Sequence, residues 1–295
     1  MSRLKSIVLP AFFPSSKNSA DGFIGALKII KGYDIDLIEF YYGGDNKQIV
    51  KEEIEKNNLQ SIYLGAIATK TQKLNLSSLD ESLRRKSVEV IKNCIDDAYY
   101  YNSTSLLINS GPRPDSKENL SLALNSFNKS IEEVLQYTNE IAKDYLLDIT
   151  LETGDIDVDY CELIGNTDYS IDVVKNIRKK YKNLYITMDT SHLKQLNESP
   201  IESIIKAKEF CSHIHLANCV LKDKMSKLYG DKHPEFGILN GEYSLEDIEK
   251  IYNQINEIYK ENKLVIGAEI ICWDGEEVSL FQNTVENMKW FYNEK

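Results

Sequence analysis

The stretch LYITMDTSH, residues 184–192, is an apolar run of strand length that ends in an acidic residue, Asp189. Three other apolar runs deliver a similar side chain: LDITLE reaches Glu152, SHIHLAN contains His215 and LVIGAE reaches Glu269. Each carboxylate or imidazole therefore appears where a buried strand is expected to meet solvent. A fold that brings the carboxyl ends of these strands to one rim would gather all four side chains.

Apolar runs of strand length alternate with segments of helical period along the chain, a pattern typical of parallel βα units. We predict eight strands, at residues 6–10, 35–40, 60–66, 104–110, 147–152, 184–189, 211–216 and 263–269. We predict helices near residues 20–31, 46–57, 81–101, 117–144, 170–182, 200–209, 244–260 and 277–293. Asp80 and Ser244 precede two of these helices and are expected to cap them.

Eight such units can close into an α/β (β/α)8 TIM barrel or form an open doubly wound sheet. The Gly-rich phosphate turn of a dinucleotide-binding sheet is missing after the first strand, which favours the barrel. A barrel takes roughly 250 residues, so residues 1–295 are expected to form a single domain. The segment 217–243 lacks a strand or helix pattern, and a loop of that length is usually functional.

The composition excludes several classes of protein. The formal net charge of −11, from 46 acidic and 35 basic residues, argues against a nucleic-acid partner. The five cysteines show no C-x-x-C spacing and are expected to be reduced, which indicates a cytoplasmic protein. The opening MSRLKSIVLPAFF fits a first strand better than a signal peptide, and no apolar run approaches the ~18 residues that span a membrane.

Three carboxylates and one imidazole form a ligand set for one divalent metal ion, and the predicted ligands are Glu152, Asp189, His215 and Glu269. Oxygen ligands favour hard ions and the nitrogen adds affinity for borderline ions, so we expect Mn²⁺ first, with Mg²⁺, Co²⁺ or Zn²⁺ as alternatives. The glutamates could instead be solvated strand-end acids, and Asp189 could instead cap a helix. Repetition of one pattern on separate strands favours the metal site.

All four histidines lie between residues 192 and 233. His192 follows Asp189 by three residues on the expected exit loop, where it could hydrogen-bond a substrate hydroxyl or carbonyl. Asp231 and His233 form a D-x-H pair on the long loop after the seventh strand. We expect this pair to contact substrate, although a loop histidine is often simply exposed.

Four other side chains are weaker candidates. His213 shares a strand face with His215 and is expected to lie in the core or to support the ligands. Arg113, in G-P-R-P, could bind an anionic substrate group, or it could be an ordinary turn arginine. Trp273 could cover the apolar face of a sugar ring, or it could serve packing alone. Glu39 ends the second strand and could shape the pocket floor.

The ordered motifs L-E-T, M-D-T-S-H, H-I-H-L, G-D-K-H-P-x-x-G and G-A-E-I resemble those of the xylose isomerase-like TIM-barrel superfamily. This superfamily includes sugar epimerases, inosose dehydratase and endonuclease IV. The resemblance implies a divalent ion, usually Mn²⁺, held by Glu152, Asp189, His215 and Glu269, with His192 touching substrate. In the epimerases, the two glutamates exchange protons at the carbon next to a carbonyl.

The nuclease branch shares the D-x-H pair but also needs histidines at the ends of early strands. Here the third strand ends in Gly65-Ala66-Ile67 and the fourth in Asn109-Ser110-Gly111, and no histidine precedes residue 192. The trinuclear zinc site of that branch is therefore incomplete. Together with the acidic balance, this favours an enzyme with one metal ion that acts on a small polyol or keto sugar.

The function that these features favour is a metal-dependent sugar isomerase or epimerase of carbohydrate metabolism, working through a metal-stabilised enediolate. Glu152 and Glu269 are candidate bases as well as ligands. The nearest alternative is a lyase of the inosose dehydratase type, with His192 or His233 as general acid. A noncatalytic sugar-binding barrel is a further alternative. The sequence leaves the choice of sugar open, and a homodimer or homotetramer is compatible with the family.

Overall fold

The computed structural model describes residues 3–260 and 263–294. Its strands follow the order β1-β2-β3-β4-β5-β6-β7-β8 in a closed barrel, which confirms the predicted (β/α)8 fold. The chain divides into two compact units: unit 1 is Met1–Ile62 with Ile214–Lys295, and unit 2 is Tyr63–His213. The boundaries between the units fall within β3 (Gln60–Leu64) and β7 (Cys211–Leu216). The assignment of residues 1–295 to a single domain stays a prediction.

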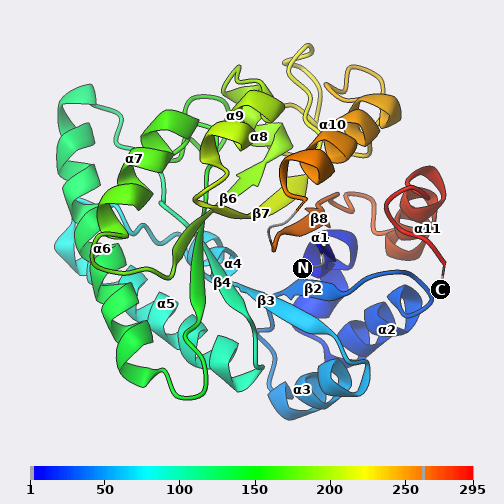
Figure 1. Ribbon diagram of the computed structural model, residues 1–295, viewed down its shortest axis with the longest axis horizontal. Coiled ribbons are helices and arrows are strands. Elements are labelled where there is room, and N and C mark those ends of the chain that lie inside the picture. The colour runs from blue at the N-terminus through cyan, green and yellow to red at the C-terminus, as the bar shows by residue number, and fades with distance from the viewer. Residues whose placement is uncertain (1–2, 261–262, 295) are drawn as a thin grey trace. The chain divides into compact units, whose positions relative to one another are not determined.

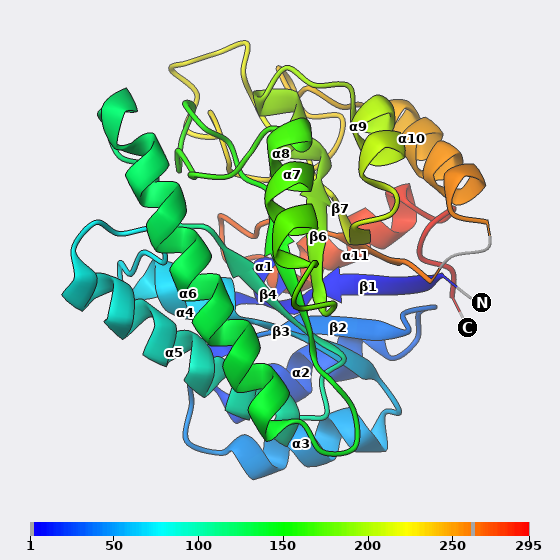
Figure 2. The same cartoon turned by 60° about the vertical axis from the view of Figure 1, so that its left-hand side comes forward.

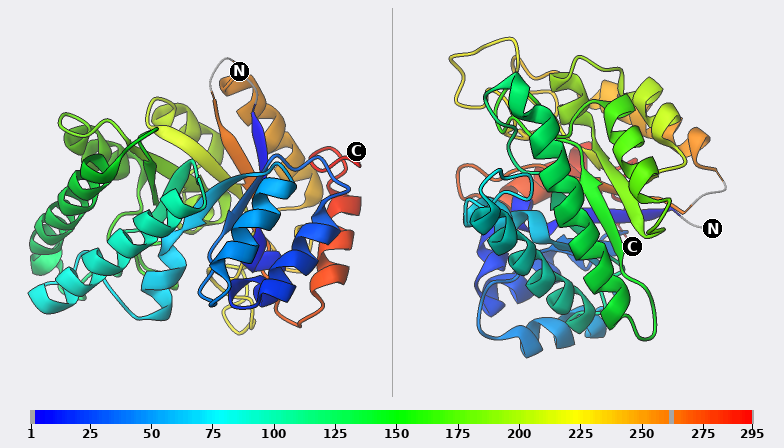
Figure 3. Two further views of the ribbon diagram at one scale, coloured as in Figure 1. Left: turned by 90° about the horizontal axis from the view of Figure 1, so that it is seen from below. Right: turned by 90° about the vertical axis from the view of Figure 1, so that its left-hand side faces the viewer.

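Unit 1 contains the first two strands and the last one. Its elements are β1 (Leu4–Val8), α1 (Leu9–Phe12), η1 (Pro14–Lys17), α2 (Ala20–Ile30), β2 (Leu37–Phe40), α3 (Lys47–Lys56), α10 (Leu245–Ile258), β8 (Val265–Ala268) and α11 (Glu277–Asn287) (Figure 1). β1 pairs in parallel with both β2 and β8, and the blue β1 and orange β8 lie side by side in Figure 3. The carboxyl ends of these three strands therefore lie at one edge.

Unit 2 contains three consecutive parallel strands. Its elements are α4 (Gly65–Thr71), α5 (Glu81–Tyr100), β4 (Ser105–Asn109), η2 (Lys117–Asn119), α6 (Leu120–Ile141), β5 (Asp148–Glu152), α7 (Thr167–Ile177), β6 (Leu184–Asp189), α8 (Thr190–Gln195) and α9 (Pro200–Ala207). In the register of the sheet, Glu152 of β5 is the partner of Asn109 on β4 and of Thr187 on β6. Side chains at the end of β5 are thus flanked by the ends of both neighbouring strands.

The long helices α5 and α6 pack against each other, as Figure 2 shows. Each buries an apolar face, which for α5 includes Val88, Ile91 and Ile95 at spacings of three and four residues. The predicted caps are confirmed: the Asp80 side chain accepts hydrogen bonds from the first turn of α5, and Ser244 forms a capping box with Asp247 at the start of α10.

Several predicted boundaries differ from the structure, and three of the differences lie where a helix directly follows a strand. β1 ends at Val8 rather than at residue 10, because Pro10 lies in the first turn of α1, where its missing N–H costs no hydrogen bond. β3 ends at Leu64, since Gly65 already begins α4. The expected exit loop after β6 is the short helix α8, which starts directly at Thr190.

The predicted long loop agrees with the structure, and the five cysteines, all among the described residues, form no disulfide. Residues 217–243 contain no helix or strand, and isolated bridges join Val220 to Tyr229 and to Gly241. Among the described residues, no helix combines the length and the apolar character that crossing a membrane requires.

Candidate functional site

In unit 2, Glu152 is the last residue of β5, and its side chain is buried. Asn109, the last residue of β4, donates from Nδ2 to Glu152 Oε2 at 3.3 Å. The amide of Asn109 thus holds the Glu152 carboxylate from the side. The sequence marked Asn109 only as a strand end, because nothing in the spacing of the residues indicates which side chain its amide contacts.

Asp189 ends β6 and also caps α8. Its Oδ1 accepts hydrogen bonds from Ser191 N at 2.6 Å, Ser191 Oγ at 2.5 Å and His192 N at 3.2 Å. The alternative role considered for Asp189, that of a helix cap, is therefore real. These bonds fix the orientation of a fully buried carboxylate, and a fixed carboxylate is also what a metal ligand requires.

His192 lies inside α8 and is 3% exposed, so its placement on an exit loop was wrong. Its Nδ1 lies 2.8 Å from the carbonyl oxygen of Thr153, the residue after Glu152. A carbonyl only accepts hydrogen bonds, so Nδ1 carries the proton and Nε2 is left to accept one. The reason for the error is Asp189, whose side chain starts a helix where the sequence suggested a loop.

In unit 1, His215 contacts a carboxylate at each ring nitrogen. Its Nε2 lies 2.8 Å from Glu39 Oε2 and its Nδ1 lies 3.0 Å from Glu269 Oε2. Glu39 is fully buried, and its Oε1 accepts a 2.6 Å hydrogen bond from Ser6 Oγ. A Cβ at Gly267 would lie 2.4 Å from both Glu39 Oε1 and Ser6 Oγ, so the glycine leaves room for this pair.

Glu269 follows the last residue of β8 and contacts two histidines. His233 Nδ1 lies 3.5 Å from Glu269 Oε2, and His233 Nε2 lies 2.6 Å from Asp231 Oδ1. Burial opposes ionisation of Glu269, but the adjacent His233 and His215 outweigh it and hold the pKa of the Glu269 carboxyl well below its usual value. The D-x-H pair singled out in the sequence therefore lies beside a predicted ligand.

The remaining candidates have different surroundings. In unit 2, His213 Nδ1 lies 3.2 Å from Thr187 Oγ1 in the core, and Arg113 Nη1 donates to the carbonyl of Ile156 at 3.0 Å. In unit 1, Trp273 is 55% exposed and donates from Nε1 to the carbonyl of Lys232. Arg113 thus ties two loops together, and Trp273 is joined to the residue before His233.

Buried aspartate, glutamate and histidine side chains at these strand ends could hold a metal ion, and none of these described groups includes a cysteine. The geometry in unit 1 fits such a role. Neighbouring ligands of an octahedral ion with bonds near 2.1 Å lie about 3 Å apart. His215 Nδ1 and Glu269 Oε2, at 3.0 Å, already have this spacing.

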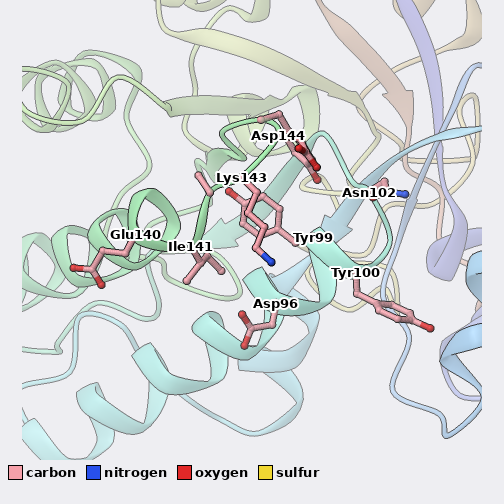
Figure 4. A pocket seen from close by; sticks show the side chains of 10 residues that line it. Asp96, Tyr99, Tyr100, Asn102, Glu140, Ile141, Lys143 and Asp144 are labelled. Carbon is pink, nitrogen blue, oxygen red and sulfur yellow. The ribbon is translucent and has the colours of Figure 1, made fainter.

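A cavity of about 610 Å³ in unit 2 lies elsewhere, between the carboxyl-terminal ends of α5 and α6 (Figure 4). Asp96, Tyr99, Glu140 and Lys143 are among its lining residues, and no candidate ligand is. Tyr145, also in its wall, precedes β5, so the cavity lies at the amino end of that strand. It is therefore separate from the candidate site.

Known proteins resemble this chain in fold more than in sequence. Residues 27–258 match the family described as xylose isomerase-like TIM barrel. An uncharacterized protein of Methanocaldococcus jannaschii is 28% identical over 183 residues, which are 60% of this chain and 56% of that protein. The match thus spans little more than half of that relative.

Three solved structures cover nearly the whole chain. A D-tagatose 3-epimerase-like protein has a TM-score of 0.69 and 18% identity, covering 96% of this chain and 97% of that one. A 3-keto-D-glucoside 4-epimerase from E. coli has a TM-score of 0.68 and 14% identity, covering 98% and 99%. An AP endonuclease family 2 protein from Brucella melitensis has a TM-score of 0.67 and 12% identity, covering 95% and 97%.

Identities this low show a shared fold and nothing finer. The family match, however, extends over most of the chain, from within α2 to the last residue of α10. The closed order of eight strands is the one that this family's description requires. The chain therefore belongs to the xylose isomerase-like TIM barrel family.

Proposed function

We propose that this chain is a divalent-metal-dependent sugar isomerase or epimerase that moves a proton at a carbon next to a carbonyl. Its ion, Mn²⁺ by preference, would be held by Glu152, Asp189, His215 and Glu269. The observation that carries the proposal is the contact of His215 with a carboxylate at each ring nitrogen. Family membership supports it, as does the fold likeness to a D-tagatose 3-epimerase-like protein and to a 3-keto-D-glucoside 4-epimerase.

The surroundings of His215 suit a metal ligand. A ligating histidine usually donates its second ring N–H to a carboxylate, which fixes the tautomer and the ring orientation. Glu39 supplies that carboxylate at Nε2, so Nδ1 is the nitrogen that would ligate. The low pKa of Glu269 keeps its carboxylate ionised, as a ligand must be.

When bound, the ion supplies positive charge that acidifies a carbon next to a carbonyl. Glu152 and Glu269 would exchange the proton with that carbon. A carboxylate of low pKa is a weak base in water, so orientation and exclusion of water must supply much of the rate. For Glu152, the hydrogen bond from Asn109 orients the carboxylate and burial excludes water from it.

Two histidines are proposed to bind substrate. His192 would present Nε2 to a substrate hydroxyl, since the carbonyl of Thr153 holds the proton on Nδ1. His233 is held by Asp231 and would contact the substrate from the long loop. In its protonated form, either His192 or His233 could donate a proton to a leaving hydroxyl, which is why a dehydratase is the second candidate.

The test is solvent hydrogen exchange. Mn²⁺-loaded protein is incubated in heavy water with a panel of ketoses, inososes and keto acids, and C–H exchange is followed by NMR. We expect deuterium at a carbon next to the carbonyl, and we expect Glu269→Gln to abolish it. Glu276→Gln, which alters an exposed glutamate near the same strand, is the matched control and should leave exchange unchanged.

The products separate the two candidate reactions. An isomerase or epimerase conserves the mass of the sugar, whereas a dehydratase releases water. If the protein binds no divalent ion in titration and elemental analysis, the proposed chemistry is wrong. If Glu269→Gln exchanges as fast as the native chain, Glu269 has no part in proton transfer.

A further inference from the structure

Unit 2 has a second cavity, of about 350 Å³, beside the carboxyl end of β4. Its walls come from α4, α5, β4 and the loop after β5, and they include Lys70, Leu74, Leu83, Asn109, Tyr160 and Glu162. Pockets that enclose small ligands measure roughly 300–1,000 Å³, so this cavity suits a single small ring. None of the roles described above uses it.

Asn109 connects this cavity to the proposed site. Its side chain lines the cavity and also donates to Glu152 Oε2 at 3.3 Å. The cavity therefore begins one side chain away from a proposed ligand. Asn109 is 4% exposed, and its Oδ1 accepts no hydrogen bond from any of the described residues. A buried acceptor in this state favours a ligand that brings a hydrogen-bond donor.

The other polar groups of the wall indicate what kind of ligand fits. Glu162 is buried, and its Oε2 accepts a 2.9 Å hydrogen bond from Ser110 Oγ. Lys70 Nζ lies 4.0 Å from the centroid of the Tyr160 ring, so its charge already faces an aromatic ring. The wall thus offers acceptors in Asn109 and Glu162 and two lysines, Lys70 and Lys73, of which Lys70 faces the Tyr160 ring.

A phosphate or carboxylate group is a poor match for this wall, because an anion brings acceptors and no donors and would meet the carboxyl of Glu162. Sugar hydroxyls both donate and accept hydrogen bonds. The apolar side chains of Leu74 and Leu83 suit the C–H surface of a sugar ring. A neutral ring with several hydroxyl groups therefore fits better than an anion.

We propose that this cavity binds a second, neutral sugar ring of the substrate, so that the preferred substrate is a keto sugar carrying a glycosyl unit rather than a free or phosphorylated monosaccharide. This inference rests on the proposed function, because it places the reacting sugar beside Glu152 and the attached ring beyond Asn109. It names a substrate class that the strand-end residues alone do not specify.

Ketose disaccharides with a free carbonyl end test the proposal. Turanose, leucrose, isomaltulose and lactulose are compared with D-fructose and D-fructose 6-phosphate by calorimetric titration of the Mn²⁺-loaded protein. We expect at least one disaccharide to bind roughly tenfold more tightly than D-fructose. Leu83→Trp fills the cavity, and Lys70→Met removes the lysine that faces Tyr160. Both should reduce this gain without weakening the binding of D-fructose. Leu122→Trp, on an exposed leucine of α6, is the matched control.

The proposal is overturned if no disaccharide binds more tightly than D-fructose, or if Leu83→Trp weakens D-fructose and disaccharide equally. A gain for D-fructose 6-phosphate that Lys70→Met removes would also overturn it, since the cavity would then bind an anion. Deuterium exchange keeps the two proposals apart. If deuterium exchanges into D-fructose but no disaccharide binds more tightly, the proposed function stands and the second-ring proposal fails. If a disaccharide binds more tightly but no ligand exchanges deuterium, only the proposed function is contradicted.

Discussion

Glu39→Gln is the substitution that most directly tests how His215 is prepared to bind a metal ion. Glu39 Oε1 accepts from Ser6 Oγ at 2.6 Å, and Oε2 lies 2.8 Å from His215 Nε2. A glutamine of the same shape that keeps the hydrogen bond donated by Ser6 Oγ places its carbonyl oxygen towards Ser6 and turns its NH₂ group towards Nε2. Two donors cannot face each other, so the imidazole proton would move to Nδ1, the nitrogen that faces Glu269.

The expected result is weaker metal binding in a folded protein. Loss of a carboxylate that supports a ligating histidine typically costs about 10–100-fold in metal affinity, and we expect Glu39→Gln to fall in this range. Mn²⁺ affinity is measured by the EPR signal of the free ion, and circular dichroism confirms the fold. Ser6→Ala in the Glu39→Gln background frees the amide to turn its oxygen towards Nε2, and it should restore part of the affinity.

The reasoning is refuted if Glu39→Gln binds Mn²⁺ as tightly as the native chain. It is also refuted if the double substitution binds less tightly than Glu39→Gln alone. In either case Glu39 would not control the proton of His215.

The remaining predictions concern packing and the rim of the site. Gly267→Ala places a methyl group 2.4 Å from Glu39 Oε1. It should therefore lower the free energy of unfolding, measured in a urea titration, by roughly 1–3 kcal/mol, and it should also lower Mn²⁺ affinity. Arg84→Met should cost roughly 1–3 kcal/mol in the same titration with Mn²⁺ affinity unchanged, because it removes the 2.9 Å bond to Glu133 and the 3.0 Å bond to Ser130 that join α5 to α6. Trp273→Ala should raise KM for a sugar substrate but change the free energy of unfolding by at most about 0.5 kcal/mol, since this side chain is 55% exposed.

The sequence was sufficient for the fold because each strand is both apolar and short. Strands buried on both faces are continuous apolar runs, and the predicted 184–189 and 211–216 agree with β6 and β7 to the residue. The errors lie where a helix begins directly after a strand, with no connecting loop. Gly65 and Leu9 continue an apolar run in sequence but belong to helices, so hydrophobicity alone could not mark the change.

The site was predictable only in its outline. A carboxylate at the end of a strand looks the same in sequence whether it would bind an ion or would orient another ligand. Glu269 is proposed for the first role and Glu39 for the second. The two roles differ in contacts between residues that are distant in sequence: Glu39 contacts His215, which is 176 residues away along the chain. Asn109 was overlooked for a similar reason, since its contact with Glu152 depends on the register of β4 and β5.

Asp189 shows why the region after β6 was the hardest to predict. One carboxylate ends the strand, accepts three hydrogen bonds at the start of α8 and is a proposed metal ligand. Because α8 begins at once, His192 is carried on a rigid first turn, and its ring is fixed by the carbonyl that follows Glu152. Asp189 thus fixes the backbone of His192, and the His192 ring contacts the residue that follows Glu152. A substitution at Asp189 would therefore disturb the position of His192 as well as the ligand set, and the two effects can be separated only by measuring metal affinity and substrate affinity independently.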